Sequence, residues 1–343
     1  MKMTIFVGTL AQLDANHVIF AREFIRRGDD VRLASLSSLA VSRGSVHAET
    51  VEWKELDAAD GLEAPRVSCF TSLEYSDLCW IMNQPHPAMA IDIWQILWNL
   101  NRRVPFVNDV GSLLFMNNKS NLTVAVPEEH LPETYVSASE EYLCGIVMKN
   151  TDRWVLKPTN GGAGNNVFVL ETGGQNSRAL IQNMTGSAAT QYELFTTDVL
   201  GIVERHAVVQ RYLSQARGEV QRVLVCCGQV ILNYGRRPAG GDHRSNYTHG
   251  GELTPPRLLT NDEQRLAHKV AQRLAELGIR FAGLDMAYPY VLELNLANPG
   301  GVVNFPAESA ADSPASRVAD LICGSLTGRG HSPAGEPGRD ESQ

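Results

Sequence analysis

The 343-residue chain lacks an excess of positive charge. It holds 30 Lys and Arg against 38 Asp and Glu, a formal net charge of −8 at pH 7, and no basic run offsets this balance. Proteins that bind RNA or DNA neutralise phosphates with clustered Lys and Arg. We therefore expect no nucleic-acid partner. The 43 % of hydrophobic and 20 % of charged residues instead indicate a globular protein with a substantial core.

Long apolar runs are missing as well. The most apolar helical segment, residues 91–100, is far shorter than the roughly 20 residues that span a membrane, and it carries Asp92 and Gln95. Residues 1–7 lack the apolar stretch of a signal peptide. The sequence therefore predicts a cytoplasmic protein with no membrane partner.

The six cysteines show no spacing typical of a metal or redox site. No C-x-x-C pair occurs, and no paired histidines stand near a cysteine. Neither a zinc site nor a disulfide framework is therefore expected. Reduced, mostly buried thiols in an intracellular protein are the better interpretation.

What is present begins with an alternation of strand and helix. Residues 4–7 form an apolar strand, a helical pattern follows Asp14 and ends at Gly28, and residues 31–34 resume a strand. This order predicts a parallel sheet with a crossover helix. The loop at residues 8–12 contains no G-x-G-x-x-G, so the dinucleotide fingerprint is absent.

Two tryptophans stand at helical spacing after the loop at residues 83–87. We interpret Trp94 and Trp98 as core or subunit-contact residues, with a cofactor contact as the alternative. A short strand at residues 77–82 is expected before this helix, and another at residues 106–108 after it.

From Trp154 the chain becomes rich in short strands and glycine turns, including a tight turn at residues 227–229. One helix interrupts this pattern. Thr260 and Glu263 form a capping box at its start, and Gly278 ends it. The segment 327–343 is rich in Gly, Pro, Ser and charge, so we expect a disordered tail.

The strongest chemical signal is a pair of strands that flank Pro289. A hairpin centred there places Asp285 directly opposite Glu293, and Asn295 shares their face because residues two apart project to the same side. Opposed carboxylates repel unless a cation lies between them, and all-oxygen ligands suit Mg²⁺. A solvated acidic hairpin is the alternative, and the apolar residues Leu292 and Leu294 on the opposite face weaken it.

A second signal is a lysine that ends a strand and precedes a glycine-rich loop. Lys157 is followed by Gly161, Gly162 and Gly164, whose backbone N–H groups can wrap phosphate oxygens. The lysine precedes the glycines and no helix follows, so the loop is not a P-loop. A plain hairpin connection is the alternative for this loop taken alone.

These segments resemble the ATP-grasp enzymes, and most closely bacterial glutathione synthetase, over residues 1 to about 326. Beyond the two signals above, the likeness is carried by the following segments: 107–108, 118–119, 210–213, Arg222, 236–241, 244–246, 250–251 and 283–285. The resemblance implies an α/β (α+β) chain with the ATP-grasp fold and an N-terminal Rossmann-like pre-ATP-grasp domain at 1–117. It further implies a lid or small subdomain at 118–205 and a catalytic subdomain at 206–326.

The resemblance also implies the residues that bind ATP and metal. Lys119 and Lys157 would bind the phosphates as cations, and the loop with Gly161, Gly162 and Gly164 would close over them. Gln210, Tyr212 and Leu213 would belong to the hinge strand that contacts adenine, and Arg236 would also bind the nucleotide. Magnesium, with Mn²⁺ as the alternative, would be held by Asp285, Glu293 and Asn295. Arg222 would face the γ-phosphate, and Arg244 with Asn246 would meet the substrate carboxylate and the acyl phosphate.

The chemistry agrees with an ATP-dependent carboxylate–amine ligase. A carboxylate reacts poorly with amines, but its phosphorylation creates a leaving group that an amine can displace as phosphate, leaving ADP as the other product. Arginines suit this role because guanidinium binds phosphate and carboxylate bidentately, although surface charge is the plainer interpretation of each one. A non-catalytic ATP-binding protein and a ligase that extends a protein or cofactor tail remain as alternatives.

Several positions depart from the glutathione synthetase pattern on the substrate side. The loop at residues 83–87 has no Arg or Lys where that family usually grips its dipeptide, and Asn118 replaces an acidic residue. For the ribose contact, Glu219 is the candidate. We therefore expect small amino-acid or peptide substrates. They are either those of glutathione synthesis or those of a different small peptide or specialised metabolite. The resemblance also implies a homo-oligomer, either a dimer or a tetramer.

Overall fold

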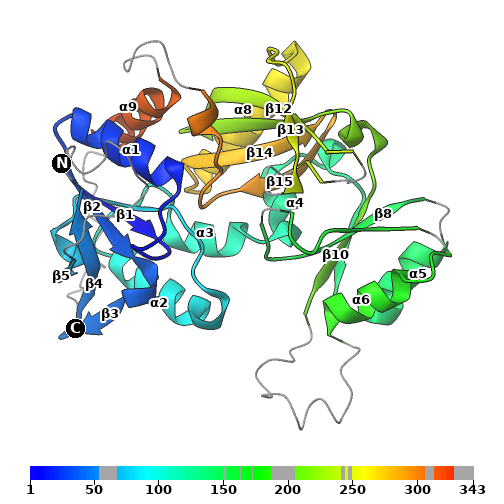
Figure 1. Cartoon of the computed structure of the whole chain (residues 1–343), viewed down its shortest axis with the longest axis horizontal. Coiled ribbons are helices and arrows are strands. Elements are labelled where there is room, and N and C mark those ends of the chain that lie inside the picture. The colour runs from blue at the N-terminus through cyan, green and yellow to red at the C-terminus, as the bar shows by residue number, and fades with distance from the viewer. Residues whose placement is uncertain are drawn as a thin grey trace, which may run out of the picture.

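The structure is a computed structural model, which describes residues 1–53, 68–149, 152–162, 164–171, 173–186, 205–240, 244–245, 249–305 and 313–327. Three separate β-sheets organise these residues. Figure 1 shows the first sheet around β1 and β2, the second around β8 and β10, and the third around β14 and β15. Apart from Thr327, the tail expected at 327–343 lies outside the described residues.

The first sheet has the strand order β3-β4-β2-β1-β6, with β5 beside β4. Strand β1 (Lys2–Val7) pairs in parallel with β2 (Asp30–Ser35) and with β6 (Leu78–Ile81), and helix α1 (Ala15–Arg26) connects the first two. The parallel sheet with a crossover helix is thus confirmed. The remaining elements of this part are β3 (Ala40–Ser42), β4 (Ser45–Glu52), β5 (Cys69–Ser72), α2 (Ala90–Asn101), α3 (Val110–Met116) and α4 (Leu122–Ala125).

The second sheet is antiparallel and has the order β7-β10-β8-β9. Its strands are β7 (Thr134–Ser137), β8 (Trp154–Pro158), β9 (Phe168–Leu170) and β10 (Ala207–Arg211). Helices α5 (Glu140–Lys149) and α6 (Ser177–Thr185) share its apolar core. Strand β10 thus pairs with β7 and β8 of this sheet, although it follows residue 205 in the chain.

The third sheet is also antiparallel, with the order β13-β12-β11-β14-β15. Its strands are β11 (Val220–Cys226), β12 (Gln229–Arg237), β13 (Glu252–Leu253), β14 (Phe281–Ala287) and β15 (Tyr290–Asn295). Helix α8 (Asn261–Glu276) packs its apolar stripe against one face, and the predicted capping box at its start is present. Helix α9 (Pro314–Thr327) packs against α1.

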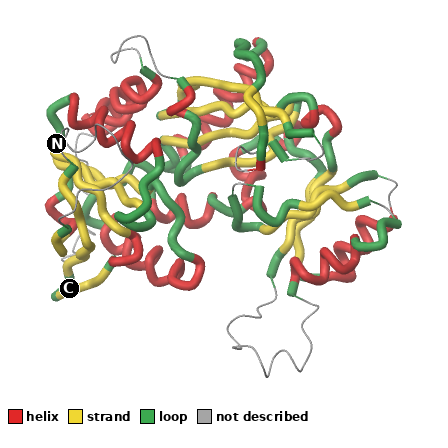
Figure 2. Tube along the Cα trace, in the orientation of Figure 1, coloured by secondary structure: helices red, strands yellow, loops and turns green. Residues whose placement is uncertain are grey.

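The connections carry short 3₁₀ helices, and Figure 2 shows how loops join the three groups of strands. These helices are Leu36–Ser38, Leu73–Tyr75, Pro87–Met89, Lys119–Asn121, Glu128–His130, Ser214–Arg217 and Val302–Asn304. The tight turn predicted after β11 is present, with positive φ at Cys227 and Gly228. None of the helices in the described part of the chain is long and apolar enough to cross a membrane.

One expectation for the N-terminal region needs correction. Residues 106–108 form no strand and contribute only isolated bridges, in which Phe106 pairs with Cys79 and Asn108 with Ile279. Trp94 is a core residue, whereas Trp98 is 56 % exposed on α2. Of the two roles expected for this pair, burial in the core applies to Trp94 alone.

Close packing at Gly283 gives the first prediction. A Cβ at this position would lie 2.7 Å from the Pro299 Cβ, and Pro299 is part of a rigid ring. We expect Gly283→Ala to lower the free energy of unfolding by about 1–3 kcal/mol because the core is overpacked. Gly145→Ala in α5 is the matched control, since nothing lies within 4 Å of its Cβ; chemical denaturation is expected to show a gain of about 0.5–1 kcal/mol. A Gly283→Ala variant as stable as the wild type would contradict the packing.

Candidate active site

A row of polar side chains crosses four strands of the third sheet. Tyr234 on β12 pairs with Arg222 on β11, Arg222 with Asp285 on β14, and Asp285 with Glu293 on β15. Directly opposed residues project to the same face of an antiparallel sheet, and Asn295 joins them two residues beyond Glu293. The predicted pairing of Asp285 with Glu293 is therefore confirmed, but the hairpin is not centred on Pro289, since Ala287 pairs with Tyr290 and Met286 with Val291. A register shift follows between Asp285 and Met286, before the turn that joins the strands.

Asp285 is held by two buried arginines. Arg222 donates from Nε to Oδ1 at 2.6 Å and from Nη2 to Oδ2 at 3.1 Å, and Arg236 donates from Nη2 to Oδ1 at 2.6 Å. Burial by itself would raise the pKa of Asp285, but the two guanidinium groups outweigh it and lower that pKa to about 2. The carboxylate is consequently ionised at any working pH, and its orientation is fixed.

Lys157 occupies the end of β8, between the second and third sheets. Its Nζ donates to Gln210 Oε1 at 3.0 Å and to the Leu292 carbonyl oxygen at 3.3 Å, and the Gln210 amide in turn donates to Thr134 Oγ1 at 3.0 Å. Burial is the main cause that lowers the pKa of Lys157 to about 8, against the opposing attraction of Glu293. The lysine is thus placed by its neighbours and remains mostly protonated at pH 7.

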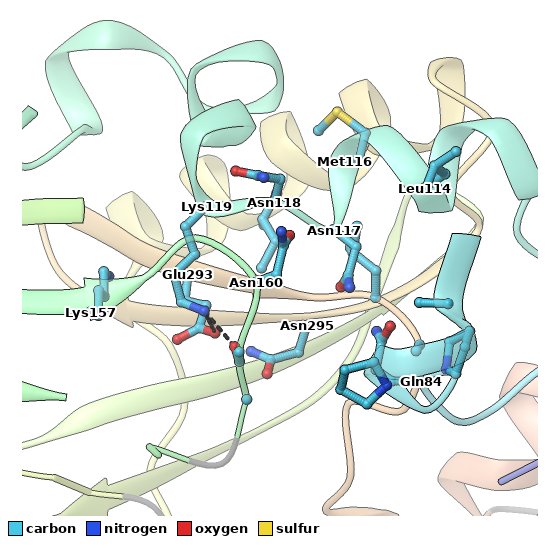
Figure 3. A pocket seen from close by; sticks show the side chains of 18 of the residues that line it. Gln84, Leu114, Met116, Asn117, Asn118, Lys119, Lys157, Asn160, Glu293 and Asn295 are labelled. Carbon is cyan, nitrogen blue, oxygen red and sulfur yellow. Dashed lines mark hydrogen bonds and ion pairs between the residues drawn. The ribbon is translucent and has the colours of Figure 1, made fainter. Parts of the chain in front are cut away.

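Lys119 joins the glycine loop to the third sheet. Its Nζ lies 3.2 Å from Glu293 Oε1 and donates to the Gly161 carbonyl oxygen. Figure 3 shows Lys119, Glu293, Asn160 and Asn295 gathered around one opening. Two lysines and a carboxylate therefore meet where the loop lies over β15.

Two pockets open from this meeting point. A narrow one of about 140 Å³ lies between the second and third sheets and is lined by β8, the glycine loop, residues 210–213 and β15. A wide one of about 790 Å³ extends toward residues 84–94 and 114–122 of the N-terminal region. The residues common to both are Lys119, Lys157, Gly161, Gly162, Gln210, Leu292 and Glu293. The two pockets are therefore adjacent and share these residues as a common boundary.

Most of the expected site residues line these pockets. The narrow pocket brings together Lys119, Lys157, Gly161, Gly162, Gly164, Gln210, Tyr212, Leu213, Arg244, Asp285 and Glu293. Asn295 lines the wide pocket. Arg244 Nη1 donates to the Gly164 carbonyl oxygen at 3.4 Å. Asn246 lies outside the described residues.

Arg222 and Arg236 differ from the expectation. Both are buried, and neither is among the residues that line the two pockets. The third nitrogen of the Arg222 guanidinium, Nη1, donates a hydrogen bond to the Pro299 carbonyl oxygen. The two side chains lie behind Asp285, where they orient the carboxylate, so a direct contact of Arg222 with the γ-phosphate does not follow from this arrangement. Glu219 is also absent from the lining, and it accepts from Thr254 and Arg257 instead.

Sequence reasoning found only part of the wall of the wide pocket. Gln84 belongs to the loop at 83–87, which the resemblance placed on the substrate side, whereas Trp94, Leu114 and Asn117 also line the pocket and were missed. The signal for these three was their position in the chain near that loop and the junction lysine. Their approach to β15 depends on how the first and third sheets pack, which no local pattern encodes.

The oxygen donors fit a divalent metal ion. Within the described residues Glu293 makes one ion pair, and Asn295 Oδ1 accepts no hydrogen bond, so both have oxygens to offer. Those residues contain no group of three or more His, Cys, Asp or Glu that could hold a metal. A hard divalent cation can be held by one or two carboxylates when water and substrate phosphates complete its shell.

Residues 120–309, more than half of the chain, match the family described as "Prokaryotic glutathione synthetase, ATP-grasp domain". The chain belongs to this family. As a member of it, the protein is an ATP-dependent carboxylate–amine ligase with the ATP-grasp fold.

Curated relatives agree with this placement. The ATP-grasp chain is 27 % identical over 315 residues to glutathione synthetase of Gloeobacter violaceus, which covers 88 % of the chain and 90 % of that protein. It is 29 % identical over 203 residues to glutathione synthetase of Escherichia coli K12, which covers 59 % and 58 %. Among solved structures, D-cycloserine synthetase DcsG matches with a TM-score of 0.61 at 11 % identity over 94 % of this chain and all of that one. The last likeness concerns the fold alone.

A phosphate-binding role of Lys157, which the resemblance implies, predicts that this ATP-grasp ligase binds ATP more weakly at high pH, because the pKa of Lys157 is lowered. At pH 7 the amine is mostly charged, and at pH 9, one unit above its pKa of about 8, it is mostly neutral. We expect the Kd for ATP to rise about tenfold from pH 7 to pH 9, because only the charged amine attracts phosphate. Lys157→Arg, which stays charged, is expected to remove this dependence in calorimetric titrations. An equal pH dependence in both proteins would contradict the assignment.

Proposed function

We propose that ATP occupies the narrow pocket, that the substrates occupy the wide one, and that the reaction takes place where the two meet. The observation that supports this arrangement most is the shared boundary of the pockets at Lys119, Lys157 and Glu293. A phosphoryl group at this boundary can face nucleotide on one side and a carboxylate on the other. Proximity of this kind converts a bimolecular step into a unimolecular one.

The adenine would lie at the far end of the narrow pocket, between apolar side chains of the second and third sheets. Val155, Leu213 and Val220 line the narrow pocket and do not line the wide one. The Tyr212 N–H is already bound to the Arg153 carbonyl oxygen. The Tyr212 carbonyl and the Leu213 N–H are therefore the backbone groups of the hinge that remain for the edge of the base.

The triphosphate would run toward the lysines. Lys119 and Lys157 would attract its oxygens, and the loop with Gly161, Gly162 and Gly164 would cover it with backbone N–H groups. Asp285, Glu293 and Asn295 would hold Mg²⁺ or, as an alternative, Mn²⁺, which neutralises charge on the transferring phosphoryl group. Arg222 and Arg236 keep Asp285 ionised and oriented for this role.

The chemistry would proceed through an acyl phosphate. A carboxylate oxygen of the first substrate attacks the γ-phosphorus, the bond to the β-phosphate oxygen breaks, and ADP leaves. The amine nitrogen of the second substrate then attacks the carbonyl carbon, phosphate departs, and the amine loses a proton to give an amide. Arg244, at the edge of the glycine loop, would stabilise the acyl phosphate by bidentate contact, and Asn246 is proposed as its partner.

A reaction panel tests this proposal. The protein is given ATP, Mg²⁺ and mixed amino acids and dipeptides, and the products are analysed by mass spectrometry together with ADP release. We expect ADP, phosphate and one new amide in equal amounts. ATP binding without substrate-stimulated ADP release for any acceptor would favour the non-catalytic ATP-binding protein instead.

We also propose small amino-acid or peptide substrates, a cytoplasmic location and a homo-oligomer, either a dimer or a tetramer. Exposed apolar side chains on α2 and α3 support self-association, since Trp98 and Phe115 are open to solvent on this chain. Light scattering after size-exclusion chromatography measures the assembly, and a monomer at micromolar concentration would overturn it.

A further inference from the structure

The wide pocket concentrates its charge at one end. Of the described residues that line it, only Lys119, Lys157 and Glu293 are Lys, Arg, Asp or Glu, and all three lie at the boundary with the narrow pocket. We call the opposite part, lined by residues 84–94 and 114–117, the distal wall. Its single titratable side chain among the described residues is His86, whose Nδ1 accepts from the Ala88 N–H.

Apolar groups supply much of the distal wall. Ile91 and Trp94 approach from α2, and Leu114 and Met116 from α3. Ile91 is 65 % exposed and Leu114 is 38 % exposed, so both side chains present apolar surface that the protein itself does not cover. Burial of such surface by a ligand is favourable by roughly 25 cal/mol per Å².

Neutral amides supply the rest. The side chains of Gln84, Asn117 and Asn160 line the pocket and make no hydrogen bond to any other described residue. Figure 3 shows Gln84 and Asn117 on the side of the opening away from Lys157, with Leu114 and Met116 above them in this view. Each amide offers a donor and an acceptor, which together suit peptide or amide groups of a ligand.

We propose that the acyl substrate is a peptide-like molecule with an apolar side chain, whose reacting carboxylate is its only anionic group in this pocket. This inference rests on the proposed function, which places the reacting carboxylate at Lys119 and Glu293. A second carboxylate on the distal wall would lose its hydration without gaining a cation, and that loss is costly. The absence of Arg and Lys from the loop at residues 83–87 thus disfavours substrates with an acidic side chain.

The test compares dipeptides that share a C-terminal alanine and differ in the first side chain. Leucyl-alanine, glutaminyl-alanine and glutamyl-alanine are offered with ATP, Mg²⁺ and a saturating mixture of amino acids. We expect kcat/KM to be at least about tenfold higher for leucyl-alanine than for glutamyl-alanine, with glutaminyl-alanine between them. Calorimetric titration of the same dipeptides, in the presence of a non-hydrolysable ATP analogue, is expected to give the same order of affinity.

Variants with a cation on the distal wall sharpen the test. Gln84→Arg and, separately, Leu114→Lys are expected to raise the relative preference for glutamyl-alanine about tenfold while ATP affinity stays the same. Both positions are partly open to solvent, so the substitutions are compatible with folding. Leu258→Lys is the control, because Leu258 is 90 % exposed and lines neither pocket.

The outcomes separate the two proposals. Equal or better use of glutamyl-alanine by the wild type, or tighter binding of it, overturns the inference and leaves the ligase reaction standing. If no dipeptide stimulates ADP release, the proposed reaction on peptides fails, and the order of the calorimetric affinities decides the inference by itself.

Discussion

Glu293→Gln is expected to lower substrate-stimulated ADP release by about a thousandfold or more and to leave the fold intact. The change removes one of the two carboxylates that would hold the metal and the partner of Lys119 at the pocket boundary. Loss of charge stabilisation on a transferring phosphoryl group costs several kcal/mol of barrier, and 1.4 kcal/mol is about tenfold in rate. Stability changes little because the side chain is partly exposed and, within the part of the chain that the structure describes, makes one ion pair.

The matched control for this variant is Glu252→Gln. Glu252 also pairs with a cation, Arg237, at 2.8 Å, but both side chains are more than half exposed and lie outside the pockets. Its activity and melting temperature are expected to equal those of the wild type. A Glu293→Gln enzyme with more than a tenth of the wild-type rate would remove Glu293 from the reaction.

Asp285→Ala is expected to abolish activity and, unlike the first variant, to lower the free energy of unfolding by about 3–5 kcal/mol. The substitution leaves the buried guanidinium groups of Arg222 and Arg236 without their shared carboxylate. Urea denaturation measures the loss. The comparison variant is Asp262→Ala, whose ion pair with Arg265 is exposed and whose effect is expected to stay within about 0.5 kcal/mol.

The pH dependence of this contribution follows from its sign. The folded pKa of Asp285, about 2, lies below the ordinary value of 3.8, so the contribution is complete above pH 4 or so and is lost as the pH falls toward 2. The difference in stability between wild type and Asp285→Ala is therefore expected to shrink on acidification through this window. A constant difference down to the acid transition would show that the carboxylate is not stabilised by the arginines.

The acidic hairpin could be predicted from sequence because its information is local. Asp285 and Glu293 flank a short turn at Pro289, and the period of two residues fixes which side chains share a face. The capping box at Thr260 and the left-handed glycine at Gly28 are local in the same sense. In each case a few neighbouring residues determine the backbone.

The role of Arg222 could not be predicted in this way. Its place opposite Asp285 depends on the pairing of β11 with β14, which are separated by more than fifty residues of chain. The membership of β10 in the second sheet and the distal wall of the wide pocket depend on equally remote contacts. Resemblance to a family supplied the chemistry, whereas the partition between residues that line the pocket and residues that orient them required the packed structure.

The fate of carboxylate oxygen tests the central claim most directly. A peptide substrate labelled with ¹⁸O in its reacting carboxylate is converted with unlabelled ATP, and the released phosphate is analysed by mass spectrometry. Attack of the carboxylate on the γ-phosphorus predicts one ¹⁸O in each phosphate, with none in ADP. Phosphate free of label, alongside formation of the amide, would contradict the acyl-phosphate route at the junction of the two pockets.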